Sequence, residues 1–574
     1  MKRLLKYMSD YKKESVLGPL FKLLEAAFEL TVPLVVASII DRGIGGGDRG
    51  YVIRMCLVLA ALGLIGLVCS VTAQYFAARA SVGFSKKVRH ELYGRIRLFS
   101  YGTLDKLGVS TLVTRMTSDV NQVQTGINLS LRLLLRSPFV VFGAMIMAFT
   151  IDARAALWFA VAIPLLSIVV FGIMLVCIPL YRKVQGRLDR VLGITRENLT
   201  GVRVLRAFGK EEDEIREFCE SNQSLTQMQK FVGRISALMN PLTYVIINII
   251  ILCLIRTGAL RVNAGVITQG AVVALYNYMS QILVELIKLA NLIINLTKSA
   301  ACAKRITEVL DTPANEEMTA GLPRGDARYR VSFKGAGIRY SEGADEALSG
   351  VDLDVLPGET VGVIGGTGSG KSTLVNLIPR FYAATEGSVY VDGEDVRGLE
   401  SASLRAKIGV VPQKALLFKG TIRDNLRWGK EDASDEEIAE AIEAAQAADV
   451  VAAKGGLDAM IEQGARNLSG GQRQRLTIAR ALVRKPEILI LDDSSSALDF
   501  ATDAALRRAL GALSWHPAVF IVSQRTGSVM HADKIVVLDD GRVVGTGTHE
   551  ELLASCAVYR EIYDSQFKKE ATQA

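Results

Sequence analysis

Paired cysteines are missing from this sequence. Its 574 residues include seven cysteines, from Cys56 to Cys556, and no spacing among them suggests a pair. Several lie inside apolar stretches, where a thiol behaves as a small buried hydrophobe. The pattern argues against a disulfide-stabilised secreted domain and against a cysteine metal site.

We do not expect the first residues to form a cleavable leader either. Residues 1–14 are polar and basic, and no apolar core with a small-residue cleavage site stands behind them. We expect this segment to form an amphipathic helix on the inner surface of a membrane.

An excess of acidic residues is also absent. Lys and Arg number 67 against 59 Asp and Glu, which gives a net charge of +8. A basic chain is compatible with nucleic acid binding, but basic loops on the cytoplasmic side of a membrane protein explain the same excess. We therefore expect a lipid bilayer as a partner and no nucleic acid.

Long apolar stretches are what the sequence does have. Half of the residues are hydrophobic, which is high for a soluble protein of this length. A bilayer core needs about 20 apolar residues in helix. We predict six spans, of which the first is the shortest: Leu30–Ile40, Met55–Ala78, Ser137–Ile151 with an extension back through Leu131–Leu135, Ala155–Leu180, Ile235–Ile255 and Val262–Val284.

The segments between the spans predict their orientation. Asp41–Gly50, Asp152–Arg154 and Arg256–Gln269 are short, whereas Arg79–Arg136 and Tyr181–Arg234 are long and rich in Lys and Arg. The positive-inside rule places the two long segments, and with them both termini, in the cytoplasm.

Each long segment is expected to continue its membrane helices into the cytoplasm and to turn around a short crossing helix. The candidates for these crossings are Tyr101–Lys106 and Val202–Phe208.

Charged residues accompany the first and last spans. Lys22, Glu25 and Glu29 share one helix face. They form either a polar wall of a substrate cavity or an interfacial Lys22–Glu25 pair with only Glu29 deeper. The same two interpretations apply to Glu285 and Lys288. These residues lie near the end of the sixth span, where a side chain can already be outside the lipid.

The second half of the chain contains a phosphate-binding loop. The apolar strand Thr360–Ile364 precedes it, and a helical pattern follows. Backbone N–H groups of such a loop wrap phosphates, its Lys reaches the β- and γ-phosphates, and its first Ser ligates Mg²⁺. The residues concerned are Gly365, Gly366, Thr367, Gly368, Ser369, Gly370, Lys371, Ser372 and Thr373.

Two further motifs fit the same chemistry. Asp492 ends the apolar strand Ile488–Leu491, and an aspartate in that position beside a phosphate loop holds Mg²⁺. The signature loop, defined here as Leu468–Gln472, places Ser469, Gly470, Gly471 and Gln472 at a helix N-terminus, which is a second anion-binding device.

With these motifs the chain resembles an ABC transporter half of the exporter type, over nearly its whole length. The resemblance implies a multidomain fold: an all-α six-helix transmembrane domain followed by an α/β P-loop NTPase domain of ABC type. The expected boundaries are 1–14 for the interfacial helix, 15–302 for the membrane domain, 303–327 for a linker and 328–574 for the ATP-binding domain.

The resemblance also implies roles for single residues. In this family two ATPase domains dimerise head to tail, and each ATP lies between the phosphate loop of one and the signature loop of the other. Tyr340 stands where the family stacks an aromatic ring on adenine, and Gln413 stands where a glutamine reaches Mg²⁺, beside Ser372 and Asp492. Ser496–Asp499 matches the loop that touches the opposite site.

Two positions depart from the family pattern. Asp493 stands where the family has its catalytic glutamate and is one methylene shorter, although a base must lie within hydrogen-bond reach of its water. Gln524 stands where the family has a histidine that contacts the γ-phosphate, and an amide cannot carry imidazolium charge.

The leading hypothesis is an ATPase-coupled translocase that exports a drug, lipid or peptide amphiphile as one subunit of a heterodimer. Its own ATP site would hydrolyse poorly, and its signature loop would complete the active site of the partner, as in heterodimeric multidrug exporters with one degenerate site. The alternatives are a nucleotide-gated channel or regulatory subunit, and an importer of a small chelate on an exporter-like fold.

Overall fold

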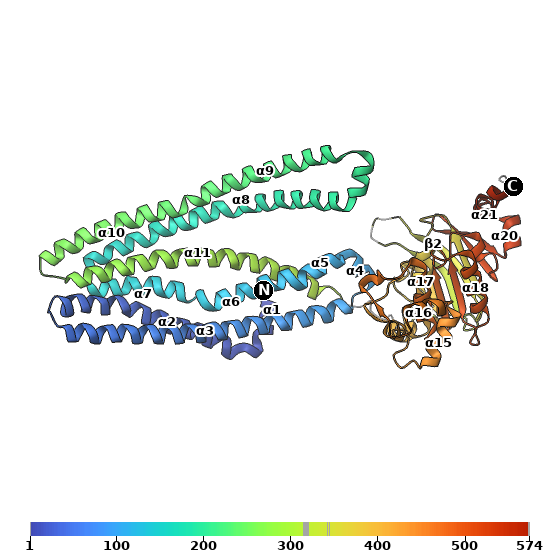
Figure 1. The fold of residues 1–574 in the computed structure, drawn as a ribbon, viewed down its shortest axis with the longest axis horizontal. Coiled ribbons are helices and arrows are strands. Elements are labelled where there is room, and N and C mark those ends of the chain that lie inside the picture. The colour runs from blue at the N-terminus through green and yellow to red at the C-terminus, as the bar shows by residue number, and fades with distance from the viewer. Residues whose placement is uncertain (1, 314–320, 341–342, 344, 572–574) are drawn as a thin grey trace. The chain divides into compact units, whose positions relative to one another are not determined.

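A computed structural model describes residues 2–313, 321–340, 343 and 345–571 (Figure 1). It divides into two compact units, which are described separately. The first contains Met1–Leu98 and Gly108–Thr312, and the second contains Phe99–Leu107 and Pro313–Ala574.

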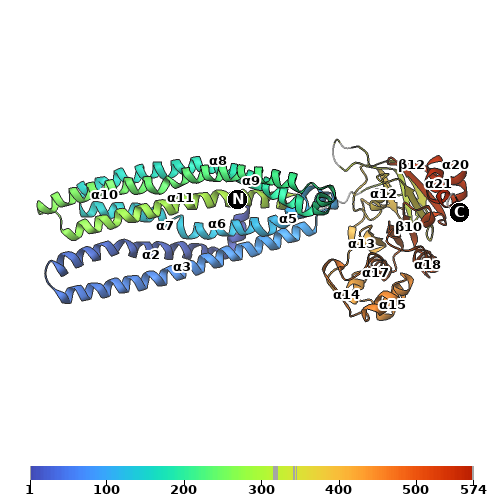
Figure 2. The same ribbon diagram turned by 45° about the horizontal axis from the view of Figure 1, so that its top comes forward.

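The first unit consists of helices that run side by side in both ribbon views (Figures 1 and 2). They are α1 (Lys2–Leu5), η1 (Lys6–Tyr11), α2 (Lys12–Ser38), η2 (Ile39–Ile44), α3 (Arg49–Arg97), α5 (Val109–Thr114), η3 (Arg115–Asp119), α6 (Val120–Leu133), α7 (Arg136–Ile151), α8 (Ala153–Phe208), α9 (Glu211–Ala237), α10 (Met239–Asn263) and α11 (Gln269–Asp311).

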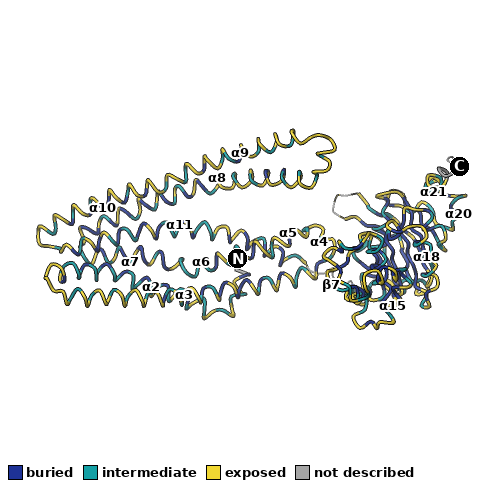
Figure 3. Tube along the Cα trace, viewed as in Figure 1, coloured by how far each residue is buried: buried dark blue, intermediate teal, exposed yellow. Residues whose placement is uncertain are grey.

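Six helical stretches in the described part of the chain are long and apolar enough to span a membrane, which confirms the predicted fold class. Much of their length is coloured as exposed in Figure 3, and many of the exposed residues are apolar. In α3, for example, Leu57, Leu64 and Leu67 are all exposed. Exposed apolar surface of this extent is typical of a membrane-embedded face.

Three predicted boundaries are wrong. The sixth span starts at Gln269 and not at Val262, because α10 continues to Asn263 and leaves only a short turn. Val202–Phe208 is the last part of the single helix α8, which ends at the left-handed Gly209, and not a separate crossing helix. Finally, α11 continues to Asp311 and so includes the start of the predicted linker; residues 314–320 of that linker lie outside the described residues.

The ends of the spans are joined by polar contacts. Asp41 accepts hydrogen bonds from the backbone N–H of Gly270 at 2.7 Å and from the hydroxyl of Thr268 at 2.6 Å. Arg261 pairs with Asp152 at the neighbouring turn. These contacts hold the ends of α2, α7, α10 and α11 at one level, opposite the long extensions.

The second unit is an α/β domain that includes the short helix α4 (Tyr101–Leu107), which matches the first predicted crossing. A six-stranded sheet has the order β12-β11-β3-β10-β9-β6, a four-stranded sheet has the order β2-β1-β4-β5, and the short strands β7 (Gly420–Thr421) and β8 (Met460–Ile461) form a separate pair. The strands are β1 (Val331–Ile338), β2 (Leu348–Val355), β3 (Thr360–Gly365), β4 (Glu386–Val391), β5 (Glu394–Asp395), β6 (Ile408–Val411), β9 (Ile488–Asp492), β10 (Ala518–Val522), β11 (Lys534–Asp539) and β12 (Arg542–Gly547).

Parallel register brings three strand ends together. On β10, Val522 lies opposite Asp492 of β9 on one side and opposite Val363 of β3 on the other. The five residues of β9 are all buried, as their apolar run predicts. Loops that follow the carboxyl ends of such strands share one edge of the sheet, which is where α/β domains bind ligands.

Candidate functional site

The loop after β3 has a backbone that only glycine tolerates. Gly368 and Gly370 have φ values of +84° and +94°, which side chains rarely adopt. A Cβ on Gly365 would lie 2.1 Å from the carbonyl oxygen of Leu538. The loop therefore leads into helix α12 (Lys371–Leu377) with its N–H groups free to face an anion.

The side chain of Lys371 folds back onto the start of this loop. Its ammonium donates to the carbonyl oxygens of Gly365 at 2.9 Å and Gly366 at 2.5 Å. Burial lowers the pKa of Lys371, while Asp493 and Asp492 act in the opposite direction. The Lys371 ammonium also donates to the hydroxyl of Ser369 at 3.4 Å. A buried ammonium that is held by neutral oxygens, with no direct carboxylate contact among the described residues, is well suited to receive a phosphate.

An oxygen-rich corner lies beside the lysine. The hydroxyl of Ser372 donates to Oδ1 of Asp492 at 2.9 Å. Burial raises the pKa of Asp492, and the neighbouring Asp493 adds to the rise. Hydroxyl and carboxylate oxygens are the ligands that Mg²⁺ prefers, and a cation there would relieve the repulsion between the two aspartates. The residues present therefore fit a phosphate-bound magnesium ion.

A cavity of about 380 Å³ brings together, from separate parts of the chain, most of the residues predicted to bind nucleotide, apart from the first two glycines of the loop and the signature loop. Its predicted members are Tyr340, Thr367, Gly368, Ser369, Gly370, Lys371, Ser372, Thr373, Gln413, Asp492, Asp493 and Gln524, and they are joined by Ala347, Val522 and Ser523. Gly365 and Gly366 start the loop that forms its floor.

Asp493 and Gln524, the two positions that differ from the family pattern, both line this cavity. Asp493 has a φ of +47°, a strained backbone that Asp tolerates better than most residues, and its N–H donates to Val522. The amide Nε2 of Gln413 lies 3.4 Å from Oδ2 of Asp493. Gln524 lines the same cavity just beyond the end of β10. Asp493 and Gln524 thus line the same cavity as Lys371 and Asp492.

The signature loop lies outside this cavity. Ser469 caps helix α17 (Gly470–Leu482): its hydroxyl accepts from the N–H of Gln472, and the side chain of Gln472 accepts from the N–H of Ser469 at 2.9 Å. Ser469 and Gly470 are exposed, whereas Leu468 is buried and anchors the loop. The capped helix therefore presents free N–H groups and its positive dipole end to solvent.

Tyr382 connects Tyr340 to α4 and was missed from the sequence. Its ring lies edge-on to Tyr340 at 5.0 Å, and its hydroxyl donates to Asp105 of α4 at 2.6 Å. Tyr340 in turn donates to the hydroxyl of Thr373 at 3.0 Å. The sequence offers no motif for Tyr382, because its partners lie far away along the chain.

Comparison with known proteins covers both units. Residues 15–286 match the family described as ABC transporter transmembrane region, and residues 348–496 match the family described as ABC transporter. The uncharacterized ABC transporter ATP-binding protein YfiB of Bacillus subtilis is 36% identical over the full length of both chains.

Two further proteins resemble the whole chain. The putative multidrug export ATP-binding/permease protein YgaD of Bacillus subtilis is 30% identical over 99% of each chain. A solved structure of a bacterial Atm1-family ABC exporter with ATP bound has the same fold, with a TM-score of 0.78 and 23% identity over 97% of this chain and 98% of the other.

Proposed function

Because the chain belongs to the ABC transporter family as an exporter-type half, with membrane region and ATPase domain in one polypeptide, we propose that it exports an amphiphile at the expense of ATP. It acts as one subunit of a heterodimer and moves the amphiphile across the cytoplasmic membrane by alternating access. The name of the similar YgaD protein, which includes multidrug export, supports a drug-like or lipid-like cargo.

The cavity after β3 binds ATP. Lys371 and the loop N–H groups hold the phosphates, Tyr340 stacks on the adenine, and Ser372, Asp492 and Gln413 surround Mg²⁺. Bound Mg²⁺ supplies charge neutralisation between the phosphate oxygens. Tyr340 is 51% exposed, so one face of its ring is free for a base.

Hydrolysis at this site is impaired, and one observation carries that part of the proposal: Asp493 and Gln524 line the cavity together with Lys371 and Asp492. The described residues that line the cavity include neither a glutamate nor a histidine that could replace the ones missing from these two positions. The site therefore retains ATP and turns it over slowly.

The signature loop serves the other ATP site. Its exposed Ser469 and Gly470 lie outside the chain's own cavity, so they are available to a nucleotide held by a second half-chain. That second chain carries the glutamate and histidine that this one lacks. Most hydrolysis then takes place at the ATP site of the second chain, to which this chain contributes only its signature loop.

Both termini and the ATPase domain lie in the cytoplasm. The basic extensions of α3, α8 and α9 beyond the membrane spans support this orientation. The ends joined by Asp41, Gly270 and Asp152 then face outward.

We expect Tyr382→Phe to leave basal ATP hydrolysis nearly unchanged and to weaken its stimulation by transported substrate several-fold. The substitution removes the hydroxyl that holds Asp105 of α4 while the ring stays against Tyr340. A hydrogen bond to a carboxylate contributes about 1.5–3 kcal/mol, which is enough to alter coupling between the domains.

The matched control for this variant is Tyr101→Phe on α4, whose ring packs against Phe381 at 4.5 Å without that bond. The measurement is ATPase activity of the complex with and without substrate. Equal stimulation in Tyr382→Phe and in the unaltered complex would contradict a coupling role.

The export function itself is tested by reconstituting the purified complex into proteoliposomes with ATPase domains outward. ATP added outside should drive a fluorescent amphiphile into the vesicle lumen, and vanadate should stop the transport. Accumulation that ignores ATP, or an ATP-independent ion conductance, would contradict it.

A further inference from the structure

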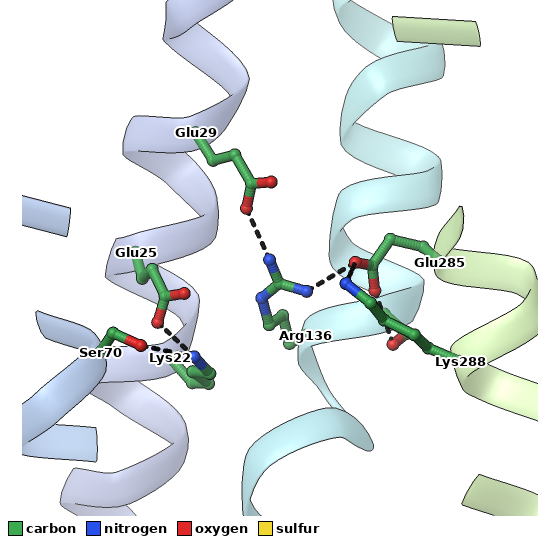
Figure 4. A network of polar contacts seen from close by, with 8 residues as sticks. Lys22, Glu25, Glu29, Ser70, Arg136, Glu285 and Lys288 are labelled. Atoms are coloured by element: carbon green, nitrogen blue, oxygen red, sulfur yellow. Dashed lines mark hydrogen bonds and ion pairs between the residues drawn. The ribbon is translucent and has the colours of Figure 1, made fainter. Parts of the chain in front are cut away.

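A network of charged side chains lies inside the membrane domain (Figure 4). It joins α2, α7 and α11 and is called here the charge network. Its members are Lys22, Glu25, Glu29, Arg136, Glu285 and Lys288, so it contains three positive and three negative groups.

The sequence itself positions the central arginine. Pro138 has no N–H to donate to the carbonyl group four residues earlier, and its ring crowds that carbonyl. The third span accordingly breaks at Leu134–Leu135, between α6 and α7, and restarts at Arg136. Arg136 was expected at the end of a cytoplasmic loop; instead it is 6% exposed inside the bundle.

Arg136 bridges two carboxylates on different helices. Its guanidinium donates to Glu285 at 2.6 Å and to Glu29 at 2.5 Å. Glu285 also accepts from Ser137 at 2.9 Å and from Lys288 at 2.8 Å, so it is saturated. Among the described residues, Glu29 makes a polar contact with Arg136 alone, and the buried Nε of Arg136 has no partner.

The network lies deep in the membrane. Arg136 and Glu285 are each about 23 Å along their helices from the outward ends at Ile151 and Gln269, at a rise of about 1.5 Å per residue. The hydrocarbon core is about 30 Å thick. These groups therefore lie in the inner half of the membrane, at the depth of an inner-leaflet amphiphile's upper chain and head group.

Exposure differs sharply within the network. The side chains of Arg136 and Glu285 are 7% and 4% exposed, whereas those of Glu29 and Lys288 are 40% and 43% exposed. A carboxylate that faces hydrocarbon at this depth costs several kcal/mol. Glu29 therefore faces the transport pathway rather than lipid, and of the two carboxylates that pair with Arg136 it is the one that a cargo can reach, since Glu285 is buried.

The balance of charge decides which head group fits. A cationic group that takes Glu29 deprives Arg136 of a partner, and an anionic group that takes Arg136 leaves Glu29 unpaired. The first case leaves Arg136 with Glu285 alone, and the second leaves Glu29 without a counter-charge, so each breaks one charge-assisted contact and gains only one in a poorly hydrated place. A head group with both charges can enter between Glu29 and Arg136, pair with both, and also approach the unpartnered Nε.

We propose that the Glu29–Arg136 pair is a cargo head-group site selective for zwitterionic amphiphiles. The site rests on the export function proposed above and adds the class of its substrate. The carboxylate of Glu29 receives the cationic end of the head group, Arg136 receives the anionic end, and Glu285 keeps Arg136 in place.

Binding without ATP tests this site separately from transport. The complete complex is placed in nanodiscs of phosphatidylglycerol, which supply no zwitterionic competitor, and empty nanodiscs give the background. The probes are dodecylphosphocholine, dodecyltrimethylammonium and dodecyl phosphate, below their micelle concentrations. The unaltered complex should bind dodecylphosphocholine about tenfold more tightly than either charged probe, as expected for one additional charge-assisted contact.

Glu29→Gln should remove this preference and bring dodecyl phosphate to at least the affinity of dodecylphosphocholine, because Arg136 then lacks one counter-charge. Glu25→Gln is the matched control: it lies one turn away on α2, pairs with Lys22 instead of Arg136, and should keep the original order.

Equal binding of all three probes, or an unchanged order in Glu29→Gln, would overturn the head-group site even if ATP-driven transport is observed. Conversely, a complex that fails to transport but keeps the Glu29-dependent preference would overturn the export function and leave the binding site intact.

Discussion

Gly470→Asp in this chain is expected to reduce ATP hydrolysis by the assembled transporter by about 10²-fold or more, as loss of a preorganised anion contact does in other enzymes. Gly470 is the first residue of α17 and is exposed outside the chain's own nucleotide cavity. A carboxylate there repels the phosphates of a nucleotide held by the partner and neutralises the positive end of the helix dipole that would attract them.

The structure predicts that this variant folds. An added Cβ at Gly470 meets no heavy atom within 4 Å. Gly511→Asp is the matched control, since Gly511 is exposed in the same domain and its Cβ would also meet open space. That control should keep nearly full activity.

A substitution in this chain's own phosphate-binding loop distinguishes the two ATP sites. Lys371→Ala removes the ammonium from this chain's cavity. It should weaken ATP binding there but leave most of the steady-state hydrolysis, which occurs in the other site. If Lys371→Ala stops hydrolysis as completely as Gly470→Asp, the two sites contribute equally and the asymmetric account is wrong.

The combined substitution Asp493→Glu with Gln524→His is expected to raise hydrolysis in this chain's site by about 10²-fold. Glutamate restores the reach of a general base, and histidine restores a donor that can carry charge beside the γ-phosphate. Both side chains already face the cavity that contains Lys371 and Asp492, so neither needs a change of the fold.

The measurement is single-turnover hydrolysis in a complex whose other site has been disabled by substitution of its catalytic glutamate. Asp493→Asn with Gln524→His serves as the control, because it restores the imidazole without a base and should stay slow. No gain in the restored double variant would contradict the assignment of these two positions as the cause of impaired hydrolysis.

The sequence could predict features that depend on neighbouring residues. Apolar runs such as Met55–Ala78 predicted spans because hydrophobic length is a local property. The loop from Gly365 to Thr373 was recognisable because its glycines, Lys371 and Ser372 stand at fixed spacing between a strand and a helix. The Asp540–Gly541 dipeptide, a typical hairpin-turn sequence, joins β11 to β12 with positive φ at both residues.

Features that depend on distant residues could not be predicted. Arg136 follows a charged segment and resembled a loop residue, since its partners Glu29 and Glu285 lie 107 and 149 positions away. The parallel register that sets Asp492 beside Val522 is likewise set by long-range pairing. Tyr382 and Asp105 are 277 positions apart, so no local pattern announces their bond.

The central claim is that this chain works with a different partner that carries the competent ATP site, and native mass spectrometry of the complex from its natural host tests it most directly. The account predicts two different half-chains at one to one, with glutamate and histidine in the second chain at the positions equivalent to Asp493 and Gln524. A complex of two identical copies would contradict it, because Asp493 and Gln524 would then stand in both sites.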